Sequence, residues 1–167
     1  MYVKKHGRDF VFPDYKPNYP RSPSFRLKHV RVELKLHVYE RRIEGRATLR
    51  LQSIKKGLSS IDLDAVDMTI RRIVEGEKEL DYSYDGSKLT IYLGRELDVD
   101  EELKVTIDYE ASPKKGLYFI LPSKRYPDVV PQVWSQGETE DNRYWIPLYD
   151  YPNMKCTSCL LYTSPSP

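Results

Sequence analysis

Apolar and polar residues alternate with a period of two along the middle of the chain. The apolar positions of the first such segment are Val30, Val32, Leu34, Leu36 and Val38. The residues between them are charged or polar, and strict alternation over this length predicts a β-strand with one buried face. After the segment YERRIEG the alternation resumes through residues 46–52. The two segments together predict a long β-hairpin.

Shorter segments of the same kind follow. The sequence predicts strands around residues 61–63, 68–73 and 103–109, and two more in GLYFIL and VVPQVWS. In YSYDGSKLTIYL, Asp85-Gly86 separates two alternating runs, which is the strongest short-range hairpin signal in the chain. No helical periodicity of useful length occurs before residue 139. The expected fold is therefore all-β, an antiparallel sandwich or a related open sheet.

The two ends of the chain differ from this pattern. Residues 1–24 contain four prolines and little periodicity, so they are expected to form an extended arm or to be disordered. The last nine residues, CLLYTSPSP, resemble the frame translation of a transposase adaptor used in sequencing libraries. We therefore expect a β-domain over residues 25–158 and a non-native tail over residues 159–167.

Charge and hydropathy exclude several classes of partner. The 167 residues include 27 Lys or Arg and 25 Asp or Glu, for a net charge of +2. The two signs are interspersed, which argues against nucleic-acid binding. No apolar run approaches the roughly 20 residues of a membrane span, and MYVKKHGRDF lacks the apolar region of a signal peptide. A cytoplasmic protein without a membrane partner is expected.

A complete catalytic apparatus is absent from the sequence. His29 and His37 are eight residues apart on one predicted strand, about 26 Å at the rise of a β-strand, so they cannot share a metal ion. Cys156 and Cys159 form a C-x-x-C pair without a second pair, and they are interpreted as two unrelated thiols. The sequence contains no H-E-x-x-H, no G-x-S-x-G and no glycine-rich phosphate loop. No metal or cofactor is expected to bind this chain.

The segment SQGETEDNRYWIPLYDYPN carries the most distinctive chemistry. Gln136 and Glu138 follow a predicted strand that ends at Trp134, and Gly137 between them permits a bend. An amide and a carboxylate on one side of a bend can bind a primary ammonium group, which has three donors. The alternative is that Glu138 is a rim carboxylate paired within its own loop.

Other residues of this segment are expected to support the site. Arg143 could neutralise Asp141 or Asp150, which would leave Glu138 free to bind an external group. The aromatic residues Tyr144, Trp145 and Tyr149 are expected to pack the loop against the sandwich.

The segment PQVWSQGETEDNRYWIPLYDYPNMKCTS resembles the signature that closes the N-terminal domain of the gluzincin zinc aminopeptidases. The family pattern is roughly T-Q-x-E-x-x-D-A-R-x-x-F-P-C-x-D-x-P. The matching residues are Gln136, Glu138, Asp141, Arg143, Pro147, Asp150 and Pro152. KKGLYFILP and VELKLHVYERRIEGRATLRL also fit, so the resemblance covers about residues 20 to 158. Asn142, Ile146 and Leu148 depart from the pattern at packing positions.

The resemblance implies a sandwich or saddle that caps one side of a thermolysin-like catalytic domain. The zinc ligands of the parent enzyme would lie on that domain, outside this chain, so the fragment alone would be inactive. By position, Glu138 would bind the α-amine of a peptide substrate and Gln136 would line the first side-chain pocket. The peptide N-terminus and the missing catalytic domain would be the partners. The surface around Tyr144, Trp145 and Tyr149 would meet that domain and form an exposed apolar patch in this chain.

Two other functions are compatible with the sequence. A relative that has lost the zinc motif would be a non-enzymatic scaffold or interaction domain of the same architecture. A stand-alone sandwich that binds carbohydrate or protein is the third possibility.

Overall fold

The computed structural model describes residue 19 and residues 21–163, and this part contains strands and one short 3-10 helix. The strands are β1 (Phe25–His37), β2 (Arg42–Ser53), β3 (Leu58–Asp64), β4 (Met68–Glu75), β5 (Lys78–Glu79), β6 (Tyr82–Tyr84), β7 (Lys88–Leu97), β8 (Glu102–Ala111), β9 (Leu117–Ile120), β10 (Gln132–Ser135) and β11 (Thr157–Thr163). The 3-10 helix η1 spans Asn142–Tyr144.

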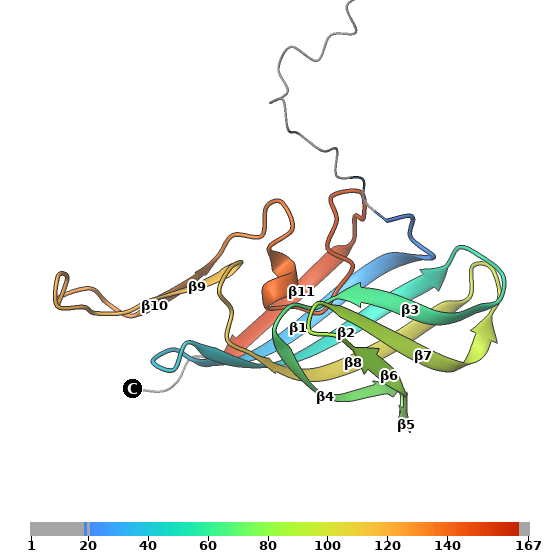
Figure 1. The fold of residues 1–167 in the computed structure, drawn as a ribbon, viewed down its shortest axis with the longest axis horizontal. Helices are drawn as coiled ribbons and strands as arrows, with labels where there is room; N and C mark the ends of the chain where they lie inside the picture. The colour runs from blue at the N-terminus through green and yellow to red at the C-terminus, as the bar shows by residue number, and fades with distance from the viewer. Residues whose placement is uncertain (1–18, 20, 164–167) are drawn as a thin grey trace, which may run out of the picture.

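The strands form two layers and a projecting ribbon. A six-stranded sheet has the order β11-β1-β2-β8-β4-β5, and a three-stranded sheet has the order β3-β7-β6. The two-stranded β9–β10 ribbon extends away from these sheets in Figure 1. All pairs are antiparallel except β1 with β11. The predicted all-β fold is confirmed, and so are the β1–β2 hairpin and the β6–β7 hairpin at Asp85-Gly86.

The core lies between the two layers and follows from the alternation in the sequence. The buried residues of β1 are Phe25, Leu27, Val30, Val32, Leu34 and Leu36. A register shift between Leu27 and His29 keeps Leu27 and Val30 on the same face. The opposite face of the large sheet is charged, with pairs such as Arg46–Asp108 and Arg71–Glu110 linking neighbouring strands. Such exposed pairs contribute at most about 1 kcal/mol each, so the apolar face dominates the stability.

Tyr109 on β8 lies across Gly45 on β2. The two residues are directly paired, and a Cβ atom at position 45 would lie 2.3 Å from the Tyr109 ring. The ring is fully buried, and its hydroxyl donates a hydrogen bond of 2.7 Å to the carbonyl of Trp145. Gly45 therefore provides the space through which a core tyrosine reaches the loop after β10.

Strand β11 crosses the boundary that the sequence predicts after Ser158. It pairs with β1 from Thr157 to Thr163, so that Cys159 lies opposite Arg31. The non-native origin of residues 159–167 remains a prediction. Most of the expected arm, residues 1–24, lies outside the described residues. Within the described part, no helix is long and apolar enough to cross a membrane.

We expect Gly45→Ala to destabilise the domain, because the added methyl group must displace the Tyr109 ring. Overpacking of this kind costs about 1–3 kcal/mol in free energy of unfolding. Urea denaturation measures the effect, with Lys104→Ala at an exposed position of β8 as the control. The control should stay within about 0.5 kcal/mol of the original chain. Equal unfolding midpoints for Gly45→Ala and the control would contradict this packing.

Candidate functional site

The candidate site lies in the loop that follows β10. The backbone N–H of Gln136 donates to the carbonyl of Gly116 at 2.9 Å. Gly116 has a φ of +77°, and a Cβ atom there would lie 1.9 Å from the carbonyl oxygen of Asp141. A Cβ atom on Gly137 would lie 2.2 Å from the side chain of Asn142. Asp141 and Asn142 thus pack closely against the backbone of Gly116 and Gly137, where a larger side chain would not fit.

Glu138 occupies an exposed position of this loop. It lines an open cavity of about 780 Å³, whose other lining residues include Tyr151, Met154 and Lys155. The carboxylate forms no ion pair with any residue of 21–163. The side chain of Gln136 is also exposed. The structure thus presents Glu138 toward a cavity in which Lys155 also lies, but the two side chains form no ion pair.

Arg143 is the central cation behind the loop. Its guanidinium lies 3.0 Å from the carboxylate of Glu140 and 3.4 Å from that of Asp150. It also donates to the Asp150 carbonyl at 2.7 Å, while its backbone N–H donates to the Asp150 carboxylate at 2.9 Å. Burial alone would lower the pKa of Arg143, but the three carboxylates around it outweigh burial and raise it. Arg143 is therefore held in its charged form.

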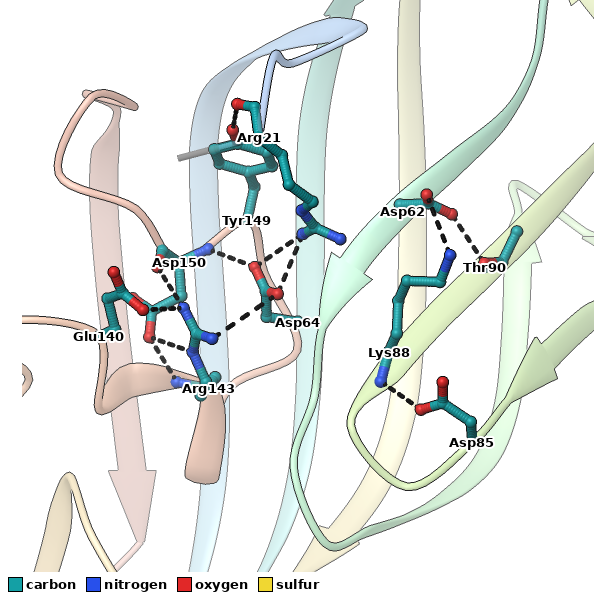
Figure 2. A network of polar contacts seen from close by, with 10 residues as sticks. All are labelled: Arg21, Asp62, Asp64, Asp85, Lys88, Thr90, Glu140, Arg143, Tyr149 and Asp150. Atoms are coloured by element: carbon teal, nitrogen blue, oxygen red, sulfur yellow. Dashed lines mark hydrogen bonds and ion pairs between the residues drawn. The ribbon is translucent and has the colours of Figure 1, made fainter. Parts of the chain in front are cut away.

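Asp64, at the end of β3, joins the loop to the sandwich. Its backbone exchanges hydrogen bonds with Leu148, at 2.7 and 3.1 Å. Its buried carboxylate accepts from the backbone N–H of Asp150 at 3.0 Å and lies 3.9 Å from the guanidinium of Arg143. Figure 2 shows this carboxylate between the side chains of Arg21 and Arg143. Asp64 thereby connects the N-terminal arm, strand β3 and the candidate loop.

Asp150 is the most deeply buried acid of the loop itself. Burial raises its pKa, whereas hydrogen bonds from the backbone of Arg143 and the side chain of Asn142 act in the opposite direction. The Asn142 amide lies 3.3 Å from the Asp150 carboxylate. These donors are needed to keep a carboxylate in this environment.

The aromatic residues of the loop are mostly internal. Trp145 is 5 % exposed and Tyr149 is 4 % exposed, and both belong to the hydrophobic core. Tyr149 packs edge-on against Phe25 at a centroid distance of 6.0 Å. The expected packing role is thus seen, but the expected apolar patch around Tyr144, Trp145 and Tyr149 is wrong. Two of the three rings are buried in the core, because the loop folds back onto the first residue of β1, Phe25.

The structure divides the predicted supporting residues into two kinds. Arg143 contacts Asp150, as one of the two predicted pairings requires, and it does not contact Asp141. Asp141 contributes through its backbone, since its N–H donates to the Gly137 carbonyl at 3.0 Å. Sequence reasoning missed Asp64, Glu140 and Arg21. Asp64 and Arg21 lie in no local pattern that would indicate a contact. Only the i, i+3 spacing of Glu140 and Arg143 could have indicated their ion pair from the sequence.

Metal ligands do not gather in the described residues. No group of three or more His, Cys, Asp or Glu side chains could hold a metal ion there. Cys156 is exposed, Cys159 is partly buried, and both are free thiols. The residues present therefore do not fit a zinc site of the kind that needs at least three protein ligands.

Comparison with known proteins gives the family. The family model described as "Peptidase M1 N-terminal domain" matches residues 17–167. The chain therefore belongs to the Peptidase M1 N-terminal domain family. The resemblance to the zinc aminopeptidases that the sequence indicated is confirmed.

Individual relatives agree with this assignment. Leukotriene A-4 hydrolase of Xenopus laevis is 29% identical over 140 residues, which cover 80% of this chain and 23% of the relative. Aminopeptidase B of Rattus norvegicus is 22% identical over 166 residues, covering 85% of this chain and 26% of the relative. The chain thus spans about a quarter of the length of these relatives.

Solved structures share the fold. Native yeast LTA4 hydrolase superposes with a TM-score of 0.73 at 21% identity, covering 93% of this chain and 26% of that one. An M1 zinc metallopeptidase from Deinococcus radiodurans, bound to a Tyr-Ser-Ala substrate, gives a TM-score of 0.67 at 18% identity. That match covers 82% of this chain and 32% of the other.

Tyr109→Phe should loosen the candidate loop without disturbing the shape of the core. The substitution leaves the buried Trp145 carbonyl without its donor, which costs about 1–3 kcal/mol. Urea denaturation should show this loss, and amide hydrogen exchange in residues 136–145 should accelerate. The matched control is Tyr92→Phe, which removes an exposed hydroxyl 3.2 Å from Ser83. If both variants exchange like the original chain, the Tyr109 contact does not hold the loop.

Proposed function

We propose that this chain is the part of a zinc-dependent aminopeptidase that forms one wall of the substrate cleft. In this proposal Glu138 binds the free α-ammonium group of a peptide, and Gln136 lines the pocket for the first side chain. The observation that carries the proposal is the state of Glu138. It is exposed, faces a cavity and forms no ion pair with residues 21–163, whereas its neighbours Glu140 and Asp150 are both engaged by Arg143.

An aminopeptidase removes one residue from the charged end of a peptide, so it must hold that end at a fixed distance from the bond that is cleaved. A fixed carboxylate does this because a charge-assisted hydrogen bond to an ammonium group contributes about 1.5–3 kcal/mol. The same contact orients the first peptide bond, so binding energy is converted into positioning. A loop held by buried contacts is suited to that role, because the reacting atoms must be placed accurately.

The metal would be bound elsewhere in the parent protein. The residues described here do not form a zinc site, and the relatives are about four times as long as this chain. We therefore place the zinc ligands and the chemical step on a catalytic domain outside this sequence. Related M1 zinc metallopeptidases have been solved with a Tyr-Ser-Ala substrate or with L-tryptophan bound, which supports a peptide or amino acid as the ligand class.

In the parent enzyme, Glu138→Gln should lower kcat/KM for substrates with a free amino terminus by about 10- to 100-fold. The substitution keeps the shape of the side chain and removes its charge, so the loss reports on the ammonium contact. Steady-state kinetics on aminoacyl substrates measure it. Glu77→Gln makes the same chemical change in the exposed turn between β4 and β5 and should leave the kinetics unchanged. Equal values of kcat/KM for the two variants would contradict the proposed contact between Glu138 and the substrate ammonium group.

The isolated chain should release no amino acids from peptides, with or without added zinc. The reason is that the residues needed to hold the metal are outside it. A chromatographic assay of free amino acids after long incubation is the measurement. Zinc-dependent release by the purified chain would show that the catalytic centre has been placed wrongly.

A further inference from the structure

Arg21 and Arg143 approach the same carboxylate from opposite sides. A guanidinium nitrogen of Arg21 lies 3.0 Å from both carboxylate oxygens of Asp64, and Arg143 lies 3.9 Å from one of them. Figure 2 shows the three side chains in a row. Arg21 comes from the N-terminal arm and Arg143 from the candidate loop, so Asp64 is shared between two segments that are far apart in the sequence.

Arg143 is divided among three acids, and its contacts with them are unequal. It is 3.0 Å from Glu140 and 3.4 Å from Asp150, both in its own loop, but 3.9 Å from Asp64. The shorter contacts are therefore within the loop. The longer one is to a carboxylate that Arg21 already neutralises.

We propose that Arg21 is a positioning residue for the ammonium-binding loop. By neutralising Asp64, it leaves the guanidinium of Arg143 free to stay on Glu140 and Asp150. The inference rests on the proposed function, in which Glu138 binds the α-amine. It adds a residue outside the loop that sets the geometry of that contact.

The charges explain why Arg21 is needed. The carboxylates of Asp64 and Asp150 are buried, and an unpaired charge is costly in such a place. Without Arg21, the nearest cation to the buried Asp64 carboxylate among residues 21–163 is Arg143. The guanidinium of Arg143 would then move toward Asp64 and weaken its contacts within the loop.

Such a movement of Arg143 would change the position of Glu138 through two sets of contacts. Glu140, which Arg143 holds at 3.0 Å, is two residues from Glu138. Asp150 also accepts from Asn142, and the Asn142 side chain fills the space against Gly137, the residue before Glu138. A shift of one guanidinium therefore changes the support on both sides of the ammonium-binding carboxylate.

The arm is held in place by aromatic residues. The Tyr149 hydroxyl donates to the carbonyl of Arg21. The Arg21 guanidinium lies over the rings of Tyr149 and Tyr151, at 5.4 and 5.5 Å from their centroids. Cation–π contacts of this kind favour a charged group at position 21. They also keep Arg21 aligned with Asp64.

The test uses the 167-residue chain in solution, with L-leucine amide as the probe and N-acetyl-L-leucine amide as the amine-blocked control. Backbone amide NMR shifts of residues 137–139 report both the resting loop and binding. The original chain should bind the free amine with a dissociation constant on the order of 10 mM and should ignore the blocked one. Arg21→Gln should shift these resonances before any ligand is added and should weaken amine binding about 10-fold, the effect expected when a charged partner is lost.

Charge rescue separates positioning from general stability. Arg21→Lys keeps the positive charge and should bind the amine within about threefold of the original chain. Arg21→Gln combined with Asp64→Asn removes both charges, so Arg143 is no longer drawn away, and the loop resonances and affinity should return. Arg46→Met, which breaks the Arg46–Asp108 pair on the outer face of the sheet, is the matched control and should change neither readout.

The outcomes distinguish the two proposals. If the original chain does not respond to L-leucine amide, the ammonium site itself is wrong, and the ligand-free shifts alone then decide the role of Arg21. If the original chain binds the amine but Arg21→Gln binds it equally well with unshifted loop resonances, the positioning role is overturned. A double variant that stays as weak as Arg21→Gln would also overturn it. Should Arg21→Gln fail to fold, the double variant and Arg21→Lys carry the test, and weak binding by either contradicts the proposal.

Discussion

The position of Glu138 depends on buried polar contacts with residues that are distant in sequence. The loop after β10 contains one turn of 3-10 helix and hydrogen bonds of its own, such as those between Arg143 and Asp150. The Tyr109 hydroxyl and the Asp64 carboxylate attach it to the sheets, across separations of 36 and 86 residues. Both lie on the two packed sheets, so the loop takes its rigidity from the sandwich. An exposed carboxylate can be well placed only if its backbone is held in this way.

Much of the fold was predictable because the relevant signal is local. Alternation of apolar and polar residues identifies the strands, and Asp85-Gly86 identifies a turn, without knowledge of distant residues. The bulge between Leu27 and His29 was not predicted, because a one-residue shift of phase has no distinctive composition. The strand at the edge of the large sheet was also less predictable than the central strands. Strand β11 pairs in parallel with β1, and such pairing depends on where a distant segment returns.

The candidate site shows the same division between local and distant information. The motif spacing identified Gln136, Glu138, Arg143 and Asp150 by resemblance, whereas Asp64 and Arg21 have no local signal. Asp64 looks like an ordinary acid at the end of a strand, and only the fold brings it next to Asp150. The wrong expectation of an apolar patch has a related cause. A sequence shows that Trp145 and Tyr149 are aromatic, but it does not show whether a loop turns them toward its own core or away from it.

The charge cluster behind the loop is better explained by orientation than by stability. Buried ion pairs often stabilise no more than apolar residues of similar volume, because desolvation offsets their attraction. A core of leucines could therefore anchor the loop equally firmly, but apolar contacts are not directional. Arg143 instead fixes Glu140, the Asp150 carboxylate and the Asp150 carbonyl at once, each in a defined direction. In the proposed function this domain supplies specificity for a chain end, and such specificity requires one carboxylate held at one distance and angle.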